Sequence, residues 1–140
     1  MLQPKSPTYA LLAVTEIARQ QPKGQQGVQA SQLAETFDLP VAYLARILSL
    51  LAARKVLRSK RGPRGGFYMA RDPRKVTVLE VINAVGGVSD LGGTVSGLRV
   101  PRGLRQGLTA VFRDAAAAAE KALAKVTVAH LLTAKTKKRR

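Results

Sequence analysis

The sequence predicts a mainly α fold of the α+β class, with short helices around one small β-hairpin and a long helix near the C-terminus. Three observations predict this class. Apolar residues recur every three or four positions in several segments, which is the period of amphipathic helices. Hydrophobic residues make up 46% of the chain and aromatic residues only 4%, which is typical of helices packed through leucine, alanine and valine. One glycine-rich stretch, 62–66, separates two short strand-like segments.

The positive charge of the chain restricts its partners. The 24 Lys and Arg residues outnumber the 8 Asp and Glu residues, which gives a net charge of +16 over 140 residues. Such a field attracts a polyanion, either nucleic acid or an anionic membrane surface. We expect no membrane partner, because the apolar runs are far shorter than a spanning helix. The lack of cysteine and of a secretory signal predicts a cytoplasmic protein, which DNA binding would place at the nucleoid.

Three helices are expected in the N-terminal part of the chain. Ser6 followed by Pro7 predicts the start of the first, which runs to about Gln20. The second fits residues 30–37, and a third begins after Pro40, because the residue before a proline resists the helical conformation. One buried stripe is expected on the third helix, at Val41, Leu44, Ile47, Leu48 and Leu51. Two short helices joined by a tight turn form a helix-turn-helix.

The segment KRGPRGGFYMAR (60–71) is expected to contain the tip of a basic hairpin. Strand-like residues 56–59 and 67–70 lie on either side of the glycines. From Arg46 to Lys75 there are ten basic residues and one acid, a local charge of +9. A basic hairpin directly after a helix-turn-helix predicts a winged helix-turn-helix domain. In such a domain one helix enters the major groove of DNA, and the wing reaches the phosphate backbone or the minor groove.

Other interpretations of this hairpin explain fewer of its residues. A nucleotide phosphate loop needs GxxxxGK[ST] or GxGxxG, and neither motif is present. GPRG (62–65) matches the GxxG loop of KH modules, but that loop joins two helices. An ordinary surface hairpin explains the glycines but not the charge.

A fourth helix and a long helix are expected beyond the hairpin. TVLE (77–80) is a capping box, followed by an apolar face at Val78, Val81, Ile82 and Val85. Residues 86–103 are glycine-rich and without periodicity, which predicts a mobile loop. A long periodic run then follows, at Leu104, Leu108, Val111, Ala115, Ala119, Ala122 and Val126. An alanine-lined helix of this length suits self-association, and the alternative is a helix packed on the chain's own core.

The C-terminal end is expected to form a short helix and a tail. Thr127 is expected to cap this helix, and His130 to lie on its surface rather than bind a metal. The tail KTKKRR (135–140) is expected to be disordered, because its like charges repel. The elements divide the chain into four parts: a DNA-binding domain (1–87), a glycine-rich loop (88–103), a dimerisation helix with a closing short helix (104–134) and a basic tail (135–140).

Four segments carry a resemblance to a known family: TYALLAV, QLAETFDLPVAYLARILSLLAARKVLRSKRGPRGGFYMAR, VTVLEVINAVGG and KVTVAHLL. With them the chain resembles the Rrf-two family of bacterial winged-helix transcription regulators, relatives of IscR, NsrR and CymR. The resemblance spans residues 6–87 and, more weakly, 104–133. It implies a homodimer, crossed through the long helix, that binds palindromic promoter DNA as a sequence-specific repressor.

The resemblance also implies particular site residues. DNA contacts would come from Thr8, Tyr9, Ala42, Tyr43, Ala45, Arg46, Ser59, Lys60, Arg61, Gly62, Arg64 and Gly65. The dimer interface would contain Leu104, Leu108, Val111, Ala115, Ala119 and Ala122. Packing of Tyr43 under the wing is the alternative for that residue. Direct base readout is expected to be thin, through Arg46 and methyl contacts, with DNA shape contributing more.

The chain departs from the family in one respect. Relatives that bind an iron–sulfur cluster carry three cysteines in the loop that matches residues 88–104, and this chain has none. We therefore expect no cofactor and no metal. The loop offers Asp90, Thr94, Ser96, Arg99 and Arg102 instead. An unknown small-molecule effector at 86–103, such as a small anion held by the two arginines, and a loop without an effector both remain open.

Two further classes of function also remain open. The net charge of +16 and the basic tail fit a nonspecific nucleoid or RNA-associated protein, which would bind any duplex alike. An adaptor controlled by a protein partner at residues 86–103 is the other. Enzymatic activity is not expected, because the sequence has no cysteine, no convincing histidine site and no cofactor loop, and its eight acids are scattered along the chain.

Overall fold

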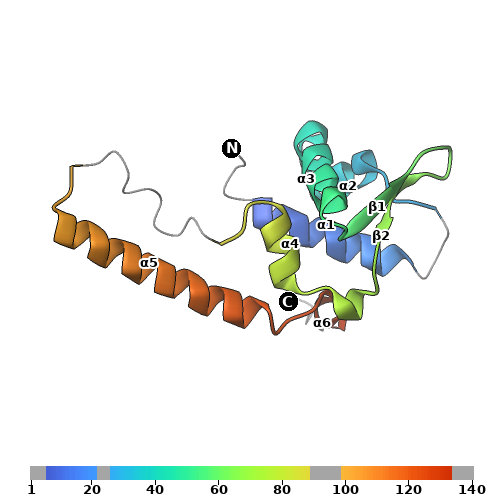
Figure 1. Ribbon diagram of the computed structural model, residues 1–140. Coiled ribbons are helices and arrows are strands. Elements are labelled where there is room, and N and C mark those ends of the chain that lie inside the picture. Colours follow the sequence, from blue (N-terminus) through green and yellow to red (C-terminus); the bar gives the residue numbers. More distant parts are fainter. Residues whose placement is uncertain (1–5, 22–25, 89–98, 134–140) are drawn as a thin grey trace, which may run out of the picture.

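The structure, a computed structural model, describes residues 6–21, 26–88 and 99–133. The expected tail at 135–140 and most of the expected loop at 86–103 lie outside these ranges. The described elements are α1 (Ser6–Gln20), α2 (Ala30–Phe37), α3 (Val41–Ala53), β1 (Leu57–Lys60), β2 (Gly66–Met69), the 3-10 helix η2 (Pro73–Lys75), α4 (Val78–Ala84), α5 (Arg102–Leu123) and α6 (Val128–Thr133) (Figure 1).

Helices α1 and α3 form the centre of the core. Ile17 of α1 and Leu44 and Leu48 of α3 are fully buried, and each such side chain contributes about 1.5–3 kcal/mol of hydrophobic stabilisation. Helix α2 packs on α3, while α4 and α6 pack on α1. The prediction of a buried stripe on α3 is confirmed at four positions and wrong at Val41, which is 51% exposed. A helical side chain lies over the turn before its own Cα, so the first residue of α3 projects beyond the packed helix.

The turn between α2 and α3 is tight. Asp38 adopts the left-handed conformation (φ 55°, ψ 55°), and the N–H of Leu39 donates to the carbonyl of Ala34 at 2.9 Å. Pro40 then precedes α3, and its carbonyl accepts the first helical hydrogen bond, from the N–H of Leu44 at 3.1 Å. The predicted helix-turn-helix is therefore confirmed.

The hairpin pairs β1 with β2 in antiparallel register, from Leu57 opposite Met69 to Lys60 opposite Gly66. Its boundaries differ by one residue from those expected, although the N–H of Ala70 still donates to the carbonyl of residue 56 at 3.1 Å. The segment before α2 extends this sheet through an isolated bridge between Val28 and Phe67. The segment around Val28 therefore lies beside β2 as a third strand-like segment, which sequence alone did not indicate.

The C-terminal segment after α5 returns to the core. The predicted capping box of α4 is confirmed, because the N–H of Glu80 donates to the Thr77 hydroxyl and the N–H of Thr77 donates to the Glu80 carboxylate, both at 3.1 Å. The N–H of Val78 donates to the carbonyl of Val126, and the N–H of Val128 donates to the carbonyl of residue 76, both at 2.8 Å. Val128 is fully buried. Val126 thus lies beyond the end of the long helix, and its expected place on that helix was wrong.

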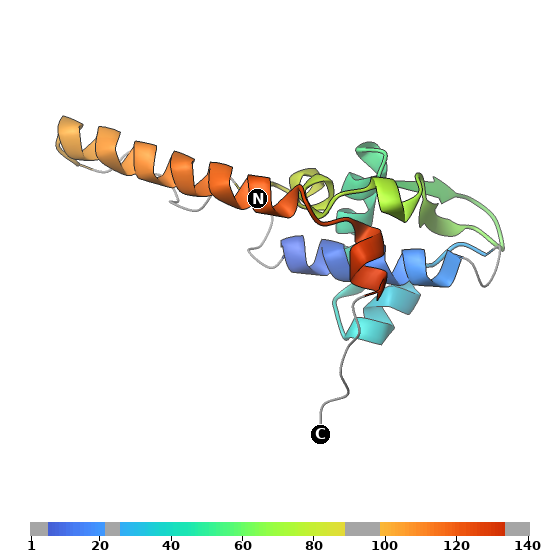
Figure 2. The ribbon, with the colours of Figure 1, turned by 90° about the horizontal axis from the view of Figure 1, so that it is seen from below.

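Helix α5 extends away from the body of the molecule in both ribbon views (Figures 1 and 2). It begins at Arg102, two residues before the periodic run, because Pro101 precedes its first turn. None of its residues is buried, although the helix contacts α4. The alternative that the long helix packs on the chain's own core is therefore wrong.

Candidate nucleic-acid interface

The recognition helix α3 and the hairpin lie on the same side of the molecule, away from α5 (Figure 1). Helix α3 also packs directly on β1. We call the hairpin and its tip, residues 57–69, the wing. The candidate interface consists of the exposed face of α3, the wing tip and the first turn of α1.

The exposed face of α3 carries one charged side chain. Ala42, Arg46 and Ser49 are exposed, while Tyr43 and Ala45 are half-buried. Because positions three and four apart are neighbours on a helix, Ala42 lies beside both Ala45 and Arg46. The face therefore presents small apolar side chains with one guanidinium at their edge.

The wing tip presents its basic side chains to solvent. Ser59, Lys60, Arg61, Gly62 and Arg64 are all exposed. The turn closes through a hydrogen bond from the N–H of Gly65 to the carbonyl of Gly62, at 2.9 Å. Gly65 itself is buried, and a Cβ there would lie 2.1 Å from the carbonyl oxygen of Lys60. This glycine therefore shapes the turn and offers little surface of its own.

The base of the wing is fixed to the segment before α2. The Gln29 side chain donates to the carbonyl of Gly65 at 2.7 Å, and the N–H of Gly27 donates to the carbonyl of Arg64 at 3.0 Å. Gly66 adopts a φ of +131°, and a Cβ there would lie 2.8 Å from backbone atoms of Gly27 and residue 28. Such a close backbone approach requires glycine. The wing tip and the start of the helix-turn-helix are therefore held in one orientation.

Two contacts from Tyr68 brace the wing from within. Its hydroxyl donates to the carbonyl of Arg64 at 2.7 Å. The guanidinium of Arg58 lies over its ring, 4.5 Å from the centroid. This cation–π contact fixes an arginine on the strand while leaving its charge in place.

The first turn of α1 contacts the recognition helix. The hydroxyl of Ser6 lies 2.5 Å from the phenolic oxygen of Tyr43, and the rings of Tyr9 and Tyr43 meet edge to face with centroids 5.6 Å apart. The alternative that Tyr43 packs under the wing is therefore wrong, because its partners belong to α1. Thr8 is exposed and Tyr9 half-buried at this end of α1.

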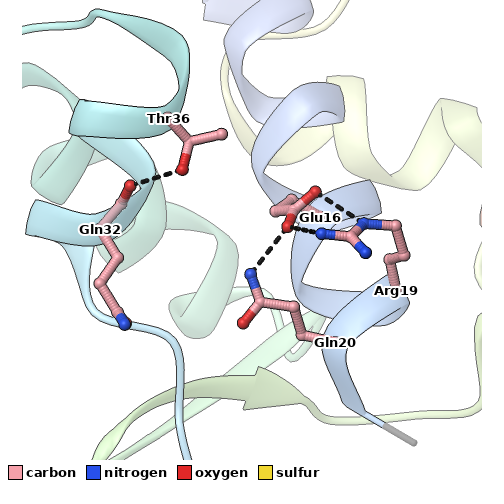
Figure 3. A network of polar contacts seen from close by, with 5 residues as sticks. All are labelled: Glu16, Arg19, Gln20, Gln32 and Thr36. Atoms are coloured by element: carbon pink, nitrogen blue, oxygen red, sulfur yellow. Dashed lines mark hydrogen bonds and ion pairs between the residues drawn. The ribbon is translucent and has the colours of Figure 1, made fainter. Parts of the chain in front are cut away.

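Described acids form ion pairs with other arginines. Glu16 accepts hydrogen bonds from Arg19 and Gln20 on the next turn of α1 (Figure 3), and Arg19 has a raised pKa through this hydrogen bond. By contrast, no described acid forms an ion pair with Arg46, Arg61 or Arg64. These three cations therefore remain available to an external anion.

Two further ion pairs lie just beyond the wing. Arg71 binds Glu80 at 2.5 Å, and Arg74 binds Asp72 at 2.7 Å. The hydrogen bond from the Arg74 side chain, and then that from the Arg74 backbone, lower the pKa of Asp72 to about 2. Partial burial opposes ionisation of Glu80, but hydrogen bonds from Arg71 and the Thr77 backbone leave its pKa below the usual value.

The expected dimer face lies along α5. Leu104 and Val111 are 55% and 61% exposed. Ala115 and Ala122 are exposed, while Leu108 and Ala119 are half-buried. The structure thus places this set on one unburied helix, separate from the candidate interface on α3 and the wing.

Most residues of the expected effector region lie outside the described ranges. This applies to Asp90, Thr94 and Ser96. Arg99 and Arg102 are described, and both are exposed near the start of α5.

An exposed helix of a helix-turn-helix beside a basic hairpin defines a winged-helix DNA-binding protein. Residues 5–134 match the family model described as Rrf2, Iron-dependent Transcriptional regulator. The chain therefore belongs to the Rrf2 family of transcriptional regulators.

Named relatives agree with this assignment. The chain is 37% identical over 78 residues to BadM of Rhodopseudomonas palustris, named as an HTH-type transcriptional regulator, a match that covers 56% of this chain and 48% of BadM. It is 32% identical over 77 residues to the HTH-type transcriptional regulator IscR of Xenorhabdus nematophila, which covers 55% of this chain and 46% of IscR. The chain spans about half the length of the curated relatives it matches. Both relatives are named as transcriptional regulators.

Solved structures show the same fold. T. potens IscR superimposes with a TM-score of 0.72 at 21% identity, over 99% of this chain and 94% of that one. CymR of B. subtilis superimposes with a TM-score of 0.69 at 21% identity, over 97% of this chain and 100% of that one. The predicted fold class is therefore confirmed. No helix among the described residues is both long and apolar enough to cross a membrane.

The family description names iron, and the residues of this chain do not fit an iron site. The sequence contains no cysteine. The Nδ1 atom of His130 accepts a hydrogen bond from the N–H of Thr127 at 3.1 Å, as part of the predicted cap of α6. Within the described ranges, His, Asp and Glu side chains form no group of three or more that could hold a metal ion. We therefore assign no iron chemistry to this chain.

Sequence reasoning missed Gln29, which supports the wing, and the exposure of Val41 at the candidate interface. Gln29 gave no local signal, because its partner Gly65 lies 36 positions further along the chain. Val41 was assigned to the core because its spacing matches the buried stripe, and periodicity does not show that a first-turn position extends past the packed region.

Proposed function

We propose that this protein is a homodimeric, sequence-specific regulator that binds palindromic promoter DNA and represses transcription. The observation that carries the proposal is the common orientation of the recognition helix and the basic wing. Arg46 on α3 and Arg61 and Arg64 on the wing are exposed on these two elements, and no described acid pairs with them. Three unpaired cations on the DNA-reading elements suit phosphates and base edges.

Each element has a distinct role in this proposal. Helix α3 enters the major groove with the Ala42, Tyr43, Ala45 and Arg46 positions, and Arg46 binds a guanine edge. On the wing, Arg61 and Arg64 reach the minor groove or the backbone, Ser59 and Lys60 contact phosphates, and Gly62 and Gly65 form the turn. At the first turn of α1, Thr8 and Tyr9 contact a neighbouring phosphate.

The proposed dimer forms through α5. This helix has no buried residue, and its apolar side chains include Leu104 and Val111 at more than half exposure. Pairing two such helices would cover both apolar faces around a twofold axis. The two wings would then meet half-sites about one helical turn of DNA apart, which is the basis for a palindromic operator.

The proposed repression depends on the binding of such a dimer to promoter DNA. A dimer that occupies promoter DNA blocks access of the polymerase to that promoter. The selected operator, placed across a promoter in a purified transcription reaction, should give less transcript as protein is added. An increase in transcript would show that the protein activates transcription, which would contradict repression but not DNA binding. The proposal places the protein in the cytoplasm, at the nucleoid.

Selection of random duplexes at near-physiological salt tests the proposal. We expect an enriched palindrome. Arg46→Ala and Arg61→Ala should each lower affinity for it by about fivefold or more, since each contact contributes about 1–3 kcal/mol. Arg113→Ala is the matched control, because it removes one exposed arginine from α5. Unchanged affinity in both interface variants would contradict the proposal.

A nonspecific nucleic-acid-binding protein is the second candidate, favoured by the net charge of +16. It predicts bound DNA that matches the input library and equal losses for Arg46→Ala and Arg113→Ala. The salt dependence also separates the candidates. Loss of a phosphate contact lowers the slope of log K against log salt by about one, whereas loss of a base contact changes affinity for one sequence only.

An effector at residues 86–103 is an addition to this proposal. Exposed Arg99 and Arg102 near the start of α5 are its described candidates for holding a small anion. Repeating the selection with cell extract, or with a protein partner recovered by pull-down, tests whether operator binding depends on a small molecule or on an adaptor interaction. Unchanged operator binding in both experiments would contradict the hypothesis of an effector.

A further inference from the structure

The recognition helix begins with an exposed valine. Val41 is the first residue of α3 and is 51% exposed, whereas Leu44, Ile47 and Leu48 on the same helix are fully buried. The exposed end of α3 is the end that enters the major groove in helix-turn-helix proteins. An aliphatic side chain therefore lies where base edges are read.

Val41 belongs to a small apolar patch. Ala45 lies one turn further along the same face, and Ala42 is adjacent and exposed. We call Val41, Ala42 and Ala45 the α3 patch. None of its side chains can donate or accept a hydrogen bond. Arg46 borders the patch beside Ala42, and no described acid forms an ion pair with that arginine.

Only one base offers a matching chemistry in the major groove. Thymine carries a C5 methyl group there, while guanine, cytosine and adenine present hydrogen-bonding edges. Opposite the α3 patch, those edges would lose water without gaining a partner, which costs free energy. A thymine methyl group would instead gain apolar contact.

We propose that the α3 patch reads thymine through its C5 methyl group, and that Val41 sets this preference. The inference rests on the proposed function, because it assumes that α3 enters the major groove of a specific operator. Duplex DNA is the occupant we assign to the patch. Arg46 is the only charged residue of α3, and the charged residues of the wing, among them Arg61 and Arg64, are all basic, while the turn before α3 carries one exposed acid, Asp38.

The test removes the methyl group and nothing else. In one half-site of the selected operator, each thymine is replaced in turn by deoxyuridine, and affinity is measured by competition at fixed salt. Three proteins are compared: the parent, Val41→Ala and Leu12→Ala. Leu12 is the matched control, because it is an exposed aliphatic residue (38% exposed) on α1.

The expected result is one thymine whose replacement weakens binding of the parent by about fourfold, the effect of one buried methyl group. In Val41→Ala this ratio should fall to about one, because the methyl group has lost its main contact. Leu12→Ala should keep the fourfold ratio.

The outcomes separate this inference from the function on which it rests. If an operator is selected but no deoxyuridine replacement weakens binding, the inference is overturned and the proposed function stands. If Val41→Ala binds both operators more weakly by the same factor, Val41 supports the helix and does not read thymine. If the selection enriches no sequence, the proposed function fails and this inference fails with it.

Discussion

The phenolic oxygen of Tyr43 lies 2.5 Å from the hydroxyl of Ser6, so a hydrogen bond joins the recognition helix to the first turn of α1. The ring of Tyr43 also meets that of Tyr9 at 80°, edge to face. Thr8 lies within the same turn. The end of α1 that is proposed to contact phosphate and the DNA-facing end of α3 are therefore positioned as one unit.

Removal of either partner of this hydrogen bond should cost similar stability. Tyr43→Phe and Ser6→Ala should each lower the free energy of unfolding by about 1 kcal/mol, since the bond is partly buried. The double variant should cost about the same as one single variant, because the second change removes nothing that remains. Urea denaturation gives the three values. Strictly additive effects would show that the two hydroxyls do not interact in solution.

The turn of the wing should tolerate alanine at some glycines and not at others. In Gly65→Ala the new Cβ would lie 2.1 Å from the carbonyl oxygen of Lys60, so the turn must open. We expect a loss of about 2 kcal/mol or more in unfolding free energy and a marked loss of operator affinity. Denaturation and competition binding provide the two measurements.

Two other glycines provide graded controls for Gly65→Ala. Gly62→Ala should cost about 1 kcal/mol, because φ is +112° there but no atom lies within 4 Å of the new Cβ. Gly107→Ala, inside α5 and equally unobstructed, should be neutral or stabilising by up to about 1 kcal/mol. Equal effects at all three positions would mean that the close approach at Gly65 does not determine the turn.

Local sequence signals predicted most of the fold. The helix starts followed from proline positions and the capping box at 77–80, and the structure places α3 and α4 there. The wing followed from glycines and charge within one short segment. The cap of α6 was also predicted, because the Thr127 side chain accepts the N–H of His130 at 3.2 Å. In each case the residues that cause the structure are neighbours in sequence.

The features that were missed depend on distant residues. The bond from Gln29 to Gly65 and the strand-like contact of Val28 with Phe67 join segments far apart in the chain. The exposure of Val41 depends on where the packing around α3 ends. Periodicity reports the face of a helix and not its depth in the molecule. Tertiary packing therefore decided the part of the candidate site that sequence could not.

Stability should fall in acid through Glu80. Its pKa is lowered in the folded protein, so folding favours the ionised form, and this contribution is present above the usual carboxyl value of 4.5. It is lost as the pH falls through the lowered pKa. Glu80→Gln should therefore lose about 0.5 kcal/mol at neutral pH, a small value because the ion pair with Arg71 is partly exposed. It should also be less sensitive to pH below 4.5 than the parent.

The acid dependence can be assigned by comparison with a second carboxylate. Asp114→Asn, which removes an exposed carboxylate of α5, is the matched control for the loss of a carboxylate at position 80. Asp72, whose pKa is lowered from 3.8 to about 2, should keep its contribution above about pH 3.8 and lose it as the pH falls from there through about 2. Chemical denaturation at a series of pH values measures all three proteins. If the free energy of unfolding of Glu80→Gln varies with pH in parallel with that of the parent, Glu80 does not cause the loss of stability in acid.

The last prediction concerns self-association through α5. Val111→Glu places a carboxylate on the apolar face of a helix that has no buried residue in the single chain, so the fold of one chain should be unaffected. If two copies pair through this face, the buried charge should convert the dimer to a monomer at micromolar concentration. Sedimentation analysis measures the mass.

Gln106→Glu makes the same change of charge at an exposed position on the opposite face of α5, and this control variant should remain dimeric. A parent protein that is already monomeric would show that no dimer forms. A Val111→Glu variant that stays dimeric would show that the dimer interface lies elsewhere. Because the proposed palindrome depends on two linked wings, the monomeric variant should also lose the preference for two half-sites over one.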